Sequence, residues 1–206
     1  MSDPVEGPRG QYHALADERP EHAFLDALER GRLHHAWMLT GPQGLGKATF
    51  AYRAARRLLG ARPDPGRGLL GSDPGDRVCR LIEQDAHPDL LVLERRTEGG
   101  KQRKSISVEE ARALPEFFSK SPSMANWRVA IIDAADDLNL SSANALLKTL
   151  EEPPERGVLF LVTHSSVKLL VAIRSRCRRL GFRPWGIDAV ASLLDMRLGL
   201  APGDAR

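Results

Sequence analysis

Apolar residues gather along the chain in four short continuous runs. A strand that is buried on both faces of a parallel sheet reads as such a run, because neither of its faces meets water. The sequence therefore predicts buried strands at 34–40, 89–96, 127–133 and 157–164.

Between these runs, apolar residues recur at helical spacing. Gly31 is expected to end the first of these segments, and Pro153 and Pro154 the last. Ser107 begins another, with a glutamate three residues later as in a capping box. Helices are expected at 21–31, 47–60, 78–84, 107–118 and 141–152. Strands that alternate with helices favour a parallel sheet covered on both faces.

The remaining segments suggest how the chain is organised. Residues 1–20 are polar and proline-containing and are expected to form an irregular arm before a core at 21–183. Residues 61–77 are rich in proline and glycine and are predicted to be loop. The charged segment 97–105 is expected to be mobile, and 184–206 is read as the truncated beginning of a helical lid domain.

Composition changes this picture little. The chain has 206 residues, of which 42% are hydrophobic and 28% charged, which is ordinary for a soluble globular protein. No signal peptide or membrane-spanning run is evident, so we expect a cytoplasmic protein without a membrane partner. A net charge of +3 does not by itself indicate nucleic-acid binding. One local cluster of arginines reads, taken alone, as a solvated charge run: Arg174, Arg176, Arg178, Arg179 and Arg183.

The segment GPQGLGKATF, residues 41–50, has the spacing of a phosphate-binding P-loop. Such a loop surrounds phosphates with backbone N–H groups at a helix N-terminus, and glycines let the backbone approach closely. The strand before it and the helix after it are the context that the motif requires. The candidate nucleotide-binding residues of this loop are Gly41, Gly44, Gly46, Lys47 and Thr49.

Two positions that should carry the chemistry of ATP hydrolysis hold alanine. The residue after the P-loop lysine normally supplies a hydroxyl to Mg²⁺, but it is Ala48, and the hydroxyl of Thr49 comes one residue too late. Asp133, at the end of an apolar strand, is the second half of such a site. The next residue, where a water-activating glutamate would stand, is Ala134. Together the two alanines argue against hydrolysis.

Three further segments are specific in combination: SSANALLKTLEEPP at 141–154, LFLVTHSSVKLL at 159–170, and IRSRCRRLGF at 173–182. They resemble the clamp-loader branch of the AAA+ proteins, over roughly residues 20 to 185. With its degraded P-loop, the chain most resembles the delta-prime subunits of bacterial DNA polymerase III. The resemblance implies an α/β fold: a three-layer P-loop AAA+ core with a mainly parallel five-stranded sheet.

The resemblance also implies roles and partners. Arg176, in the Ser-Arg-Cys triplet, matches the family's arginine finger, which acts in trans on a neighbouring subunit's ATP, and Thr163 matches its polar sensor position. Implied partners are the tau/gamma and delta subunits, with the sliding clamp and primed DNA reached through the complex. A component of a polymerase complex is expected, with no polymerase site in this chain.

Relatives of this kind carry a four-cysteine zinc module, which this sequence lacks. Structural zinc needs four ligands, normally Cys or His, and only Cys79 remains in this region, with Asp73 and Asp76 where cysteines would be expected. His87 reads as a turn residue, and strand alternation should point His34 and His35 to opposite faces. We predict no zinc and no required cofactor.

The sequence leaves open whether ATP or ADP binds without being hydrolysed. Its main alternative to a non-hydrolysing subunit is an active AAA+ motor subunit of the tau/gamma type, in which a shifted loop lets Thr49 replace the missing hydroxyl. A P-loop kinase is a third reading, which the arginine triplet does not support.

Overall fold

The computed structural model describes residues 7–13, 17–95, 97–98, 101–103, 105–188 and 190–191. Its centre is a five-stranded parallel sheet of order β2-β5-β6-β1-β7. The strands are β1 (Ala36–Thr40), β2 (Leu90–Glu94), β5 (Arg128–Asp133), β6 (Gly157–Thr163) and β7 (Arg178–Gly181), and a separate hairpin pairs β3 (Thr97–Glu98) with β4 (Lys101–Gln102). The predicted α/β core is confirmed, and β1, β2, β5 and β6 lie at the predicted apolar runs.

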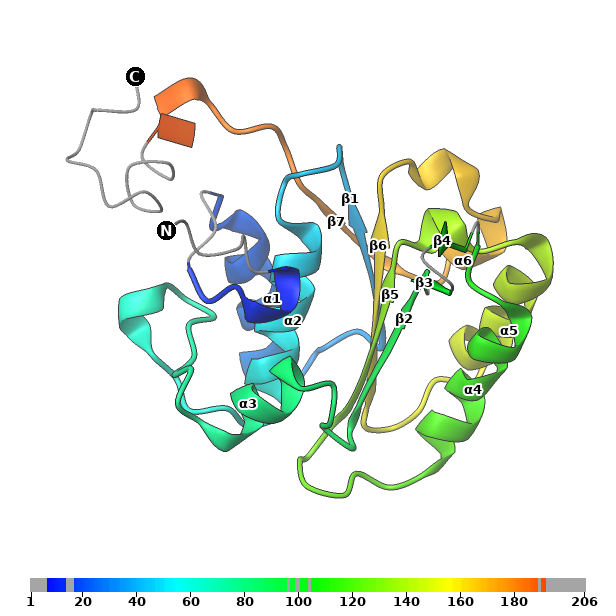
Figure 1. Cartoon of the computed structure of the whole chain (residues 1–206), viewed down its shortest axis with the longest axis horizontal. Coiled ribbons are helices and arrows are strands. Elements are labelled where there is room, and N and C mark those ends of the chain that lie inside the picture. The colour runs from blue at the N-terminus through cyan, green and yellow to red at the C-terminus, as the bar shows by residue number, and fades with distance from the viewer. Residues whose placement is uncertain are drawn as a thin grey trace.

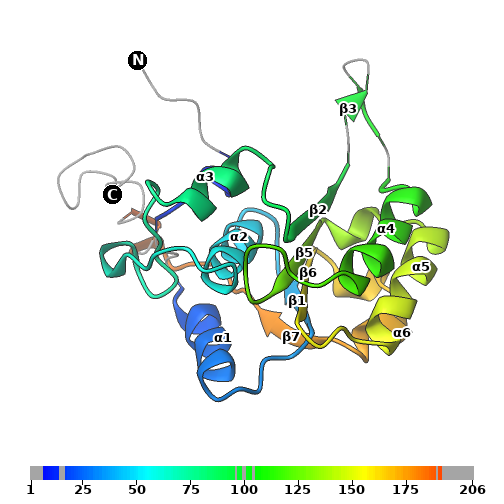
Figure 2. The same cartoon turned by 90° about the horizontal axis from the view of Figure 1, so that it is seen from below.

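Helices cover both faces of this sheet, so the core has three layers (Figure 1, and from below in Figure 2). One face carries α1 (Arg19–Glu29), α2 (Lys47–Leu58) and α3 (Arg77–Glu83), and the other carries α4 (Val108–Ser119), α5 (Leu140–Glu151) and α6 (Val171–Arg174). The first face is packed with aromatic rings, among them Phe24, Trp37 and Phe160. The second is mainly aliphatic. Most of the lid segment, expected at 184–206, lies outside the described residues.

The arginine-rich stretch contains the fifth strand, which its charge pattern did not predict, although Arg178, Arg179 and Arg183 are exposed as a solvated charge run implies. β7 pairs with β1 at the edge of the sheet, and Leu180 is its one buried residue. An edge strand of four residues needs few apolar positions, because much of it stays in water. Arg178 covers the ring of Trp37, with its guanidinium carbon 4.8 Å from the ring centroid. The charge pattern concealed the strand.

A buried ion pair joins helices α1 and α2 to the N-terminal arm and the proline-rich loop. Glu21 of α1 and Arg53 of α2 are almost fully buried, with Nε and Oε1 2.7 Å apart. Arg53 also donates to the backbone carbonyls of Tyr12 and Arg67, and Glu21 accepts from the backbone N–H of Leu70. One pair therefore fastens two helices, the N-terminal arm and the proline-rich loop.

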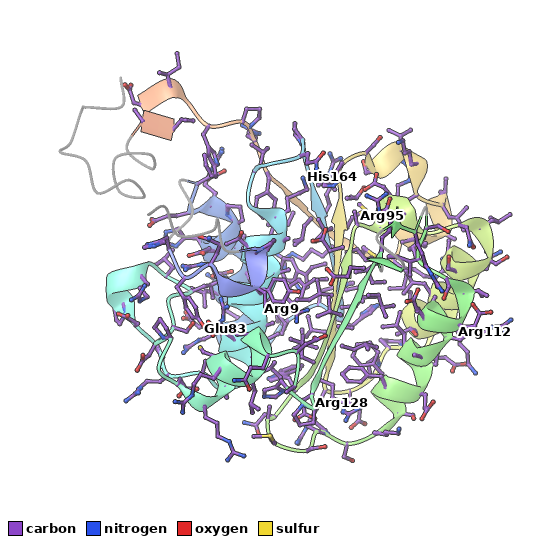
Figure 3. All side chains as sticks on the ribbon, in the orientation of Figure 1. Arg9, Glu83, Arg95, Arg112, Arg128 and His164 are labelled. Carbon is purple, nitrogen blue, oxygen red and sulfur yellow. The ribbon has the colours of Figure 1, made fainter. Side chains whose placement is uncertain are left out.

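Opposite the P-loop, at the amino end of the sheet, Asp89 organises the connection between α4 and β5. Its carboxylate accepts from the backbone N–H groups of Ser123, Met124 and Ala125, at 2.7, 2.7 and 3.0 Å. Burial raises the pKa of this carboxyl, but these bonds outweigh burial and hold the pKa below its usual value. Arg128, which lies at this end in Figure 3, is 3.5 Å away. The nearby His87 accepts the N–H of Asp89 at Nδ1.

We expect stability to fall as the pH drops through the range in which histidine titrates. Burial lowers the pKa of His87, and Asp89 only partly opposes this. Protonation of Nδ1 would also place a hydrogen against the N–H of Asp89. The unfolded chain therefore binds the proton more readily, and stability present above about pH 6.5 is lost below it. Denaturant unfolding at pH 7.5 and 5.5 should show this loss, and His87→Asn, which keeps an acceptor but does not titrate, should reduce it. Equal losses in both proteins would contradict the assignment to His87.

Candidate nucleotide site

The P-loop connects β1 to α2 at the carboxyl edge of the sheet. Its glycines Gly41, Gly44 and Gly46 all have positive φ angles, of 146°, 84° and 78°. At Gly41 a Cβ would lie 2.4 Å from the backbone oxygen of Phe182, which follows β7, so no other residue fits there. The strand–loop–helix context predicted from the spacing is confirmed.

The P-loop lysine is turned onto its own loop. Lys47, the first residue of α2, is 3% exposed, and its Nζ donates to the carbonyl oxygens of Gly41, at 2.6 Å, and Pro42. Burial lowers the pKa of this ammonium, while the charges of Asp133 and Asp136 oppose the shift. Lys47 must leave both carbonyls before its charge can reach a phosphate.

The hydroxyl of Thr49 does not take the place of the one missing at Ala48. The two residues are consecutive in α2, and consecutive side chains of a helix point about 100° apart around its axis. Ala48 packs against the aromatic face of the core. A hydroxyl at 49 therefore replaces one at 48 only if the helix starts in a different register.

Asp133 ends β5 beside the P-loop lysine. Burial raises the pKa of its carboxyl, and Glu94, its partner in the register of β2, adds to the rise, while His164 and Lys47 oppose it. Such a shift reflects a buried carboxyl among other acids. The next residue is the buried Ala134, whose methyl cannot polarise water.

The two aspartates that follow, Asp136 and Asp137, are engaged elsewhere. Asp136 accepts the backbone N–H groups of His164 and Ser165, at 2.7 and 3.0 Å, and so anchors the turn after β6. Asp137 pairs with Arg95 at 2.8 Å. Figure 3 shows His164 and Arg95 at the end of the sheet away from Arg128. Neither carboxylate replaces the one missing at Ala134.

Thr163 ends β6 and is fully buried, opposite Thr40 of β1 in the register. Its Oγ1 accepts the N–H of Ser165 at 3.2 Å. The fold thus brings Thr163, Asp133, Lys47 and the glycines to one edge of the sheet, since the carboxyl ends of parallel strands meet there. A sensor role for Thr163 stays a prediction.

Arg176 lies apart from this group, between α6 and β7. Its Nη1 donates to the backbone oxygen of Ala172 at 3.0 Å, and its Nη2 is 3.0 Å from Oε1 of Glu151, at the end of α5. Its side chain is 38% exposed. A group in this position is open to another molecule, as a residue acting in trans must be.

Sequence reasoning missed three of the residues around these positions. Glu94 is the last residue of β2 and lies opposite Asp133 in the strand register, so a prediction of that register could have identified it. No sequence signal marks Glu151 as a partner of Arg176, because it is one of several charged residues at the end of α5. Arg179 donates from Nε to Oγ1 of Thr40 at 3.1 Å, a contact hidden by the unrecognised β7.

The two aspartates that the resemblance sets at cysteine positions are engaged locally, Asp73 in a turn and Asp76 as the N-cap of α3. Asp73 and Asp76 accept the N–H groups of Gly75 and Val78, and Cys79 is buried beside Tyr12. Within the described ranges no three His, Cys, Asp or Glu side chains group as metal ligands. The donor set does not fit structural zinc.

His34 and His35 stack, with ring centroids 4.4 Å apart, so the prediction that they point to opposite faces of a strand was wrong. Both precede β1, which begins at Ala36, so strand alternation does not apply to them. In the described part of the chain, no helix has the length and apolar character needed to cross a membrane.

Known proteins resemble this chain in sequence and in fold. A family model described as DNA polymerase III, delta subunit, matches residues 17–186. The delta' subunit of Pseudomonas aeruginosa is 36% identical over 165 residues, which are 79% of this chain and 48% of the relative. The tau subunit of Escherichia coli is 32% identical over 188 residues, 90% of this chain and 26% of tau. The chain thus spans about half the length of the delta' relative.

Solved structures share the fold at low identity. A gamma subunit-related protein of DNA polymerase III from Thermotoga maritima matches with a TM-score of 0.59 and 21% identity, over 84% of this chain and 49% of that one. The RuvB Holliday junction branch migration motor of the same organism gives 0.53 and 19%, over 92% and 53%. These likenesses bear on the fold alone, and they agree with an AAA+ core. By the family match and the delta' relatives, the chain belongs to the family of the DNA polymerase III delta subunit, as a delta-prime-like clamp-loader member.

Proposed function

We propose that this chain is a non-hydrolysing subunit of a DNA polymerase III clamp loader, which scaffolds the ATP-driven loading of a sliding clamp on primed DNA. The observation that carries the proposal is the pair of alanines at the nucleotide site. Ala48 and Ala134 stand where a Mg²⁺-binding hydroxyl and a water-activating carboxylate belong. The residues present do not fit the Mg²⁺-bound nucleotide of a hydrolysing site, and no step of hydrolysis is assigned to this chain.

The position of Lys47 supports the same proposal. In P-loop proteins this lysine neutralises the β- and γ-phosphates. Here its ammonium is bonded to two carbonyls of its own loop. Phosphate binding must replace both bonds, which weakens any binding of ATP or ADP at this loop.

The chain contributes Arg176 to the ATP site of a neighbouring tau/gamma-type subunit. A guanidinium is charged at every physiological pH, and its rigid fork matches the oxygens of a γ-phosphate. The partly exposed position of Arg176, away from its own P-loop, supports action in trans. Partners of the complex include the delta subunit, and the clamp and primed DNA are reached through the assembly.

An active motor subunit of the tau/gamma type is the alternative. The similarity to tau extends over 90% of this chain, so identity alone does not separate the two functions. The difference lies in chemistry, since a motor needs the hydroxyl and the carboxylate that the two alanines remove.

We therefore expect negligible steady-state turnover of Mg-ATP by the purified chain. A coupled assay of phosphate release measures this directly, and Lys47→Ala serves as the control for a contaminating ATPase. Residual turnover that persists unchanged in Lys47→Ala belongs to a contaminant. Magnesium-dependent turnover that is lost in Lys47→Ala would falsify the proposal and favour the motor.

A further inference from the structure

Glu151 and Arg176 come from different elements and meet at the surface. Glu151 is the last residue of α5, and Arg176 follows α6 by two residues. The backbone N–H of Arg176 donates to Ile173 at 3.1 Å, which fixes where the side chain begins. The guanidinium is then held at two points, by Ala172 and by the carboxylate of Glu151, both at 3.0 Å.

These contacts restrain the guanidinium without using all of it. An arginine has five N–H donors in a planar fork, and the two contacts occupy one donor each on Nη1 and Nη2. Among the described residues no other hydrogen bond or ion pair to this guanidinium is found, which leaves three donors for a further group. A long side chain that is already restrained loses less conformational freedom when it binds, so prior restraint makes the binding more favourable.

We propose that Glu151 is a positioning residue for Arg176, which holds the guanidinium in the geometry that it uses on a neighbouring subunit's γ-phosphate. The inference rests on the proposed role of Arg176 as a finger. Glu151 touches no substrate in this account and acts only through the arginine. The opposite role for the same contact would be a latch that withdraws the finger. The two roles predict effects of opposite sign.

The expected effect is modest, because both side chains are partly exposed, at 38% for Arg176 and 52% for Glu151. In a complete complex reconstituted with the partner subunits, Glu151→Ala should lower kcat for ATP about two- to five-fold, as expected for an exposed ion pair. The KM for ATP should not change, because the finger acts on charge that develops in the transition state. Glu151→Gln keeps an acceptor without the charge and should give a smaller loss.

A matched control and a double-mutant cycle separate positioning from a general effect on structure. Glu152, the exposed neighbour that follows α5, has no ion pair among the described residues, and Glu152→Ala should leave kcat unchanged. In an Arg176→Ala background, Glu151→Ala should cause no further loss. In the isolated chain, NMR relaxation of the Arg176 Nε–Hε group should show greater motion after Glu151→Ala.

Each outcome decides between the accounts. A rise in kcat on Glu151→Ala overturns positioning in favour of a latch. An unchanged kcat, an unchanged motion of Arg176, or an equal loss in the Arg176→Ala background also overturns it. If Arg176→Ala lowers kcat but Glu151→Ala does not, only this inference fails. If Arg176→Ala does not change kcat, the proposal that Arg176 is an arginine finger is refuted, and the positioning role of Glu151 is refuted with it.

Discussion

Glu21→Gln is expected to lower the free energy of unfolding by about 3–5 kcal/mol, the cost typical of removing one partner from a buried ion pair. The substitution conserves shape but leaves the charge of Arg53 buried without its counter-ion. Denaturant unfolding followed by circular dichroism measures this loss. We expect a lower midpoint with an unchanged m-value, because the same surface is exposed on unfolding.

A second carboxylate of the same helix provides the control. Asp26 pairs with Arg30 at 2.7 Å, but the two side chains are 52% and 61% exposed. Asp26→Asn should change stability by no more than about 0.5 kcal/mol, because exposed pairs contribute little. If Glu21→Gln lowers the free energy of unfolding no more than Asp26→Asn does, the buried pair does not hold α1 and α2 together as described.

Replacement of both partners by apolar residues should not restore stability. Apolar replacement of a buried ion pair is often neutral or stabilising elsewhere. Here Arg53 also satisfies the backbone carbonyls of Tyr12 and Arg67, and Glu21 satisfies the N–H of Leu70. Glu21→Leu combined with Arg53→Met leaves these groups buried without partners, at about 1–3 kcal/mol each.

Arg176→Ala should lower ATP turnover at the adjacent subunit by about 10³-fold or more, as removal of an arginine finger does. The loss measured for a whole complex will be smaller, since other interfaces keep their own fingers. Arg176→Lys should not rescue turnover fully, because an ammonium lacks the planar fork. Pre-steady-state ATPase and clamp-loading rates, measured on reconstituted complexes, provide the test.

Arg183→Ala is the matched control, since Arg183 is an exposed arginine of the same cluster. It should leave both rates unchanged, and gel filtration should show intact assembly for all three variants. Unmodified rates for both Arg176 variants would contradict the finger assignment. Equal losses for Arg176→Ala and Arg183→Ala would instead indicate a general electrostatic role of the cluster.

Much of the nucleotide edge could be predicted because it depends on local patterns. The glycine spacing requires a tight loop between strand and helix, and Asp133 stands at a strand end that its apolar run makes visible. The hydrogen bonds from Lys47 to its own loop have no such sequence signal, because they depend on where the two carbonyl groups point in the folded loop.

Other features were hidden because charged residues are normally read as solvent-facing. Arg53 and Arg56 lie within a predicted helix but are buried, since their guanidinium groups meet carbonyls of the N-terminal arm. The β7 strand was concealed for another reason: its arginines are exposed, and with Leu180 as its one buried residue it has no apolar run. Neither the pair formed by Arg53 nor the strand has a local sequence signature, since both depend on segments distant along the chain.

The central claim is that this chain completes a neighbour's ATP site while performing no hydrolysis at its own. The most direct test compares Lys47→Ala with Arg176→Ala, each in a reconstituted complex whose other subunits are unmodified, by measuring DNA- and clamp-stimulated ATP turnover. The account predicts that Lys47→Ala leaves turnover unchanged and that Arg176→Ala lowers it strongly. A strong loss with Lys47→Ala and none with Arg176→Ala would contradict the account, because the chain would then be a motor subunit.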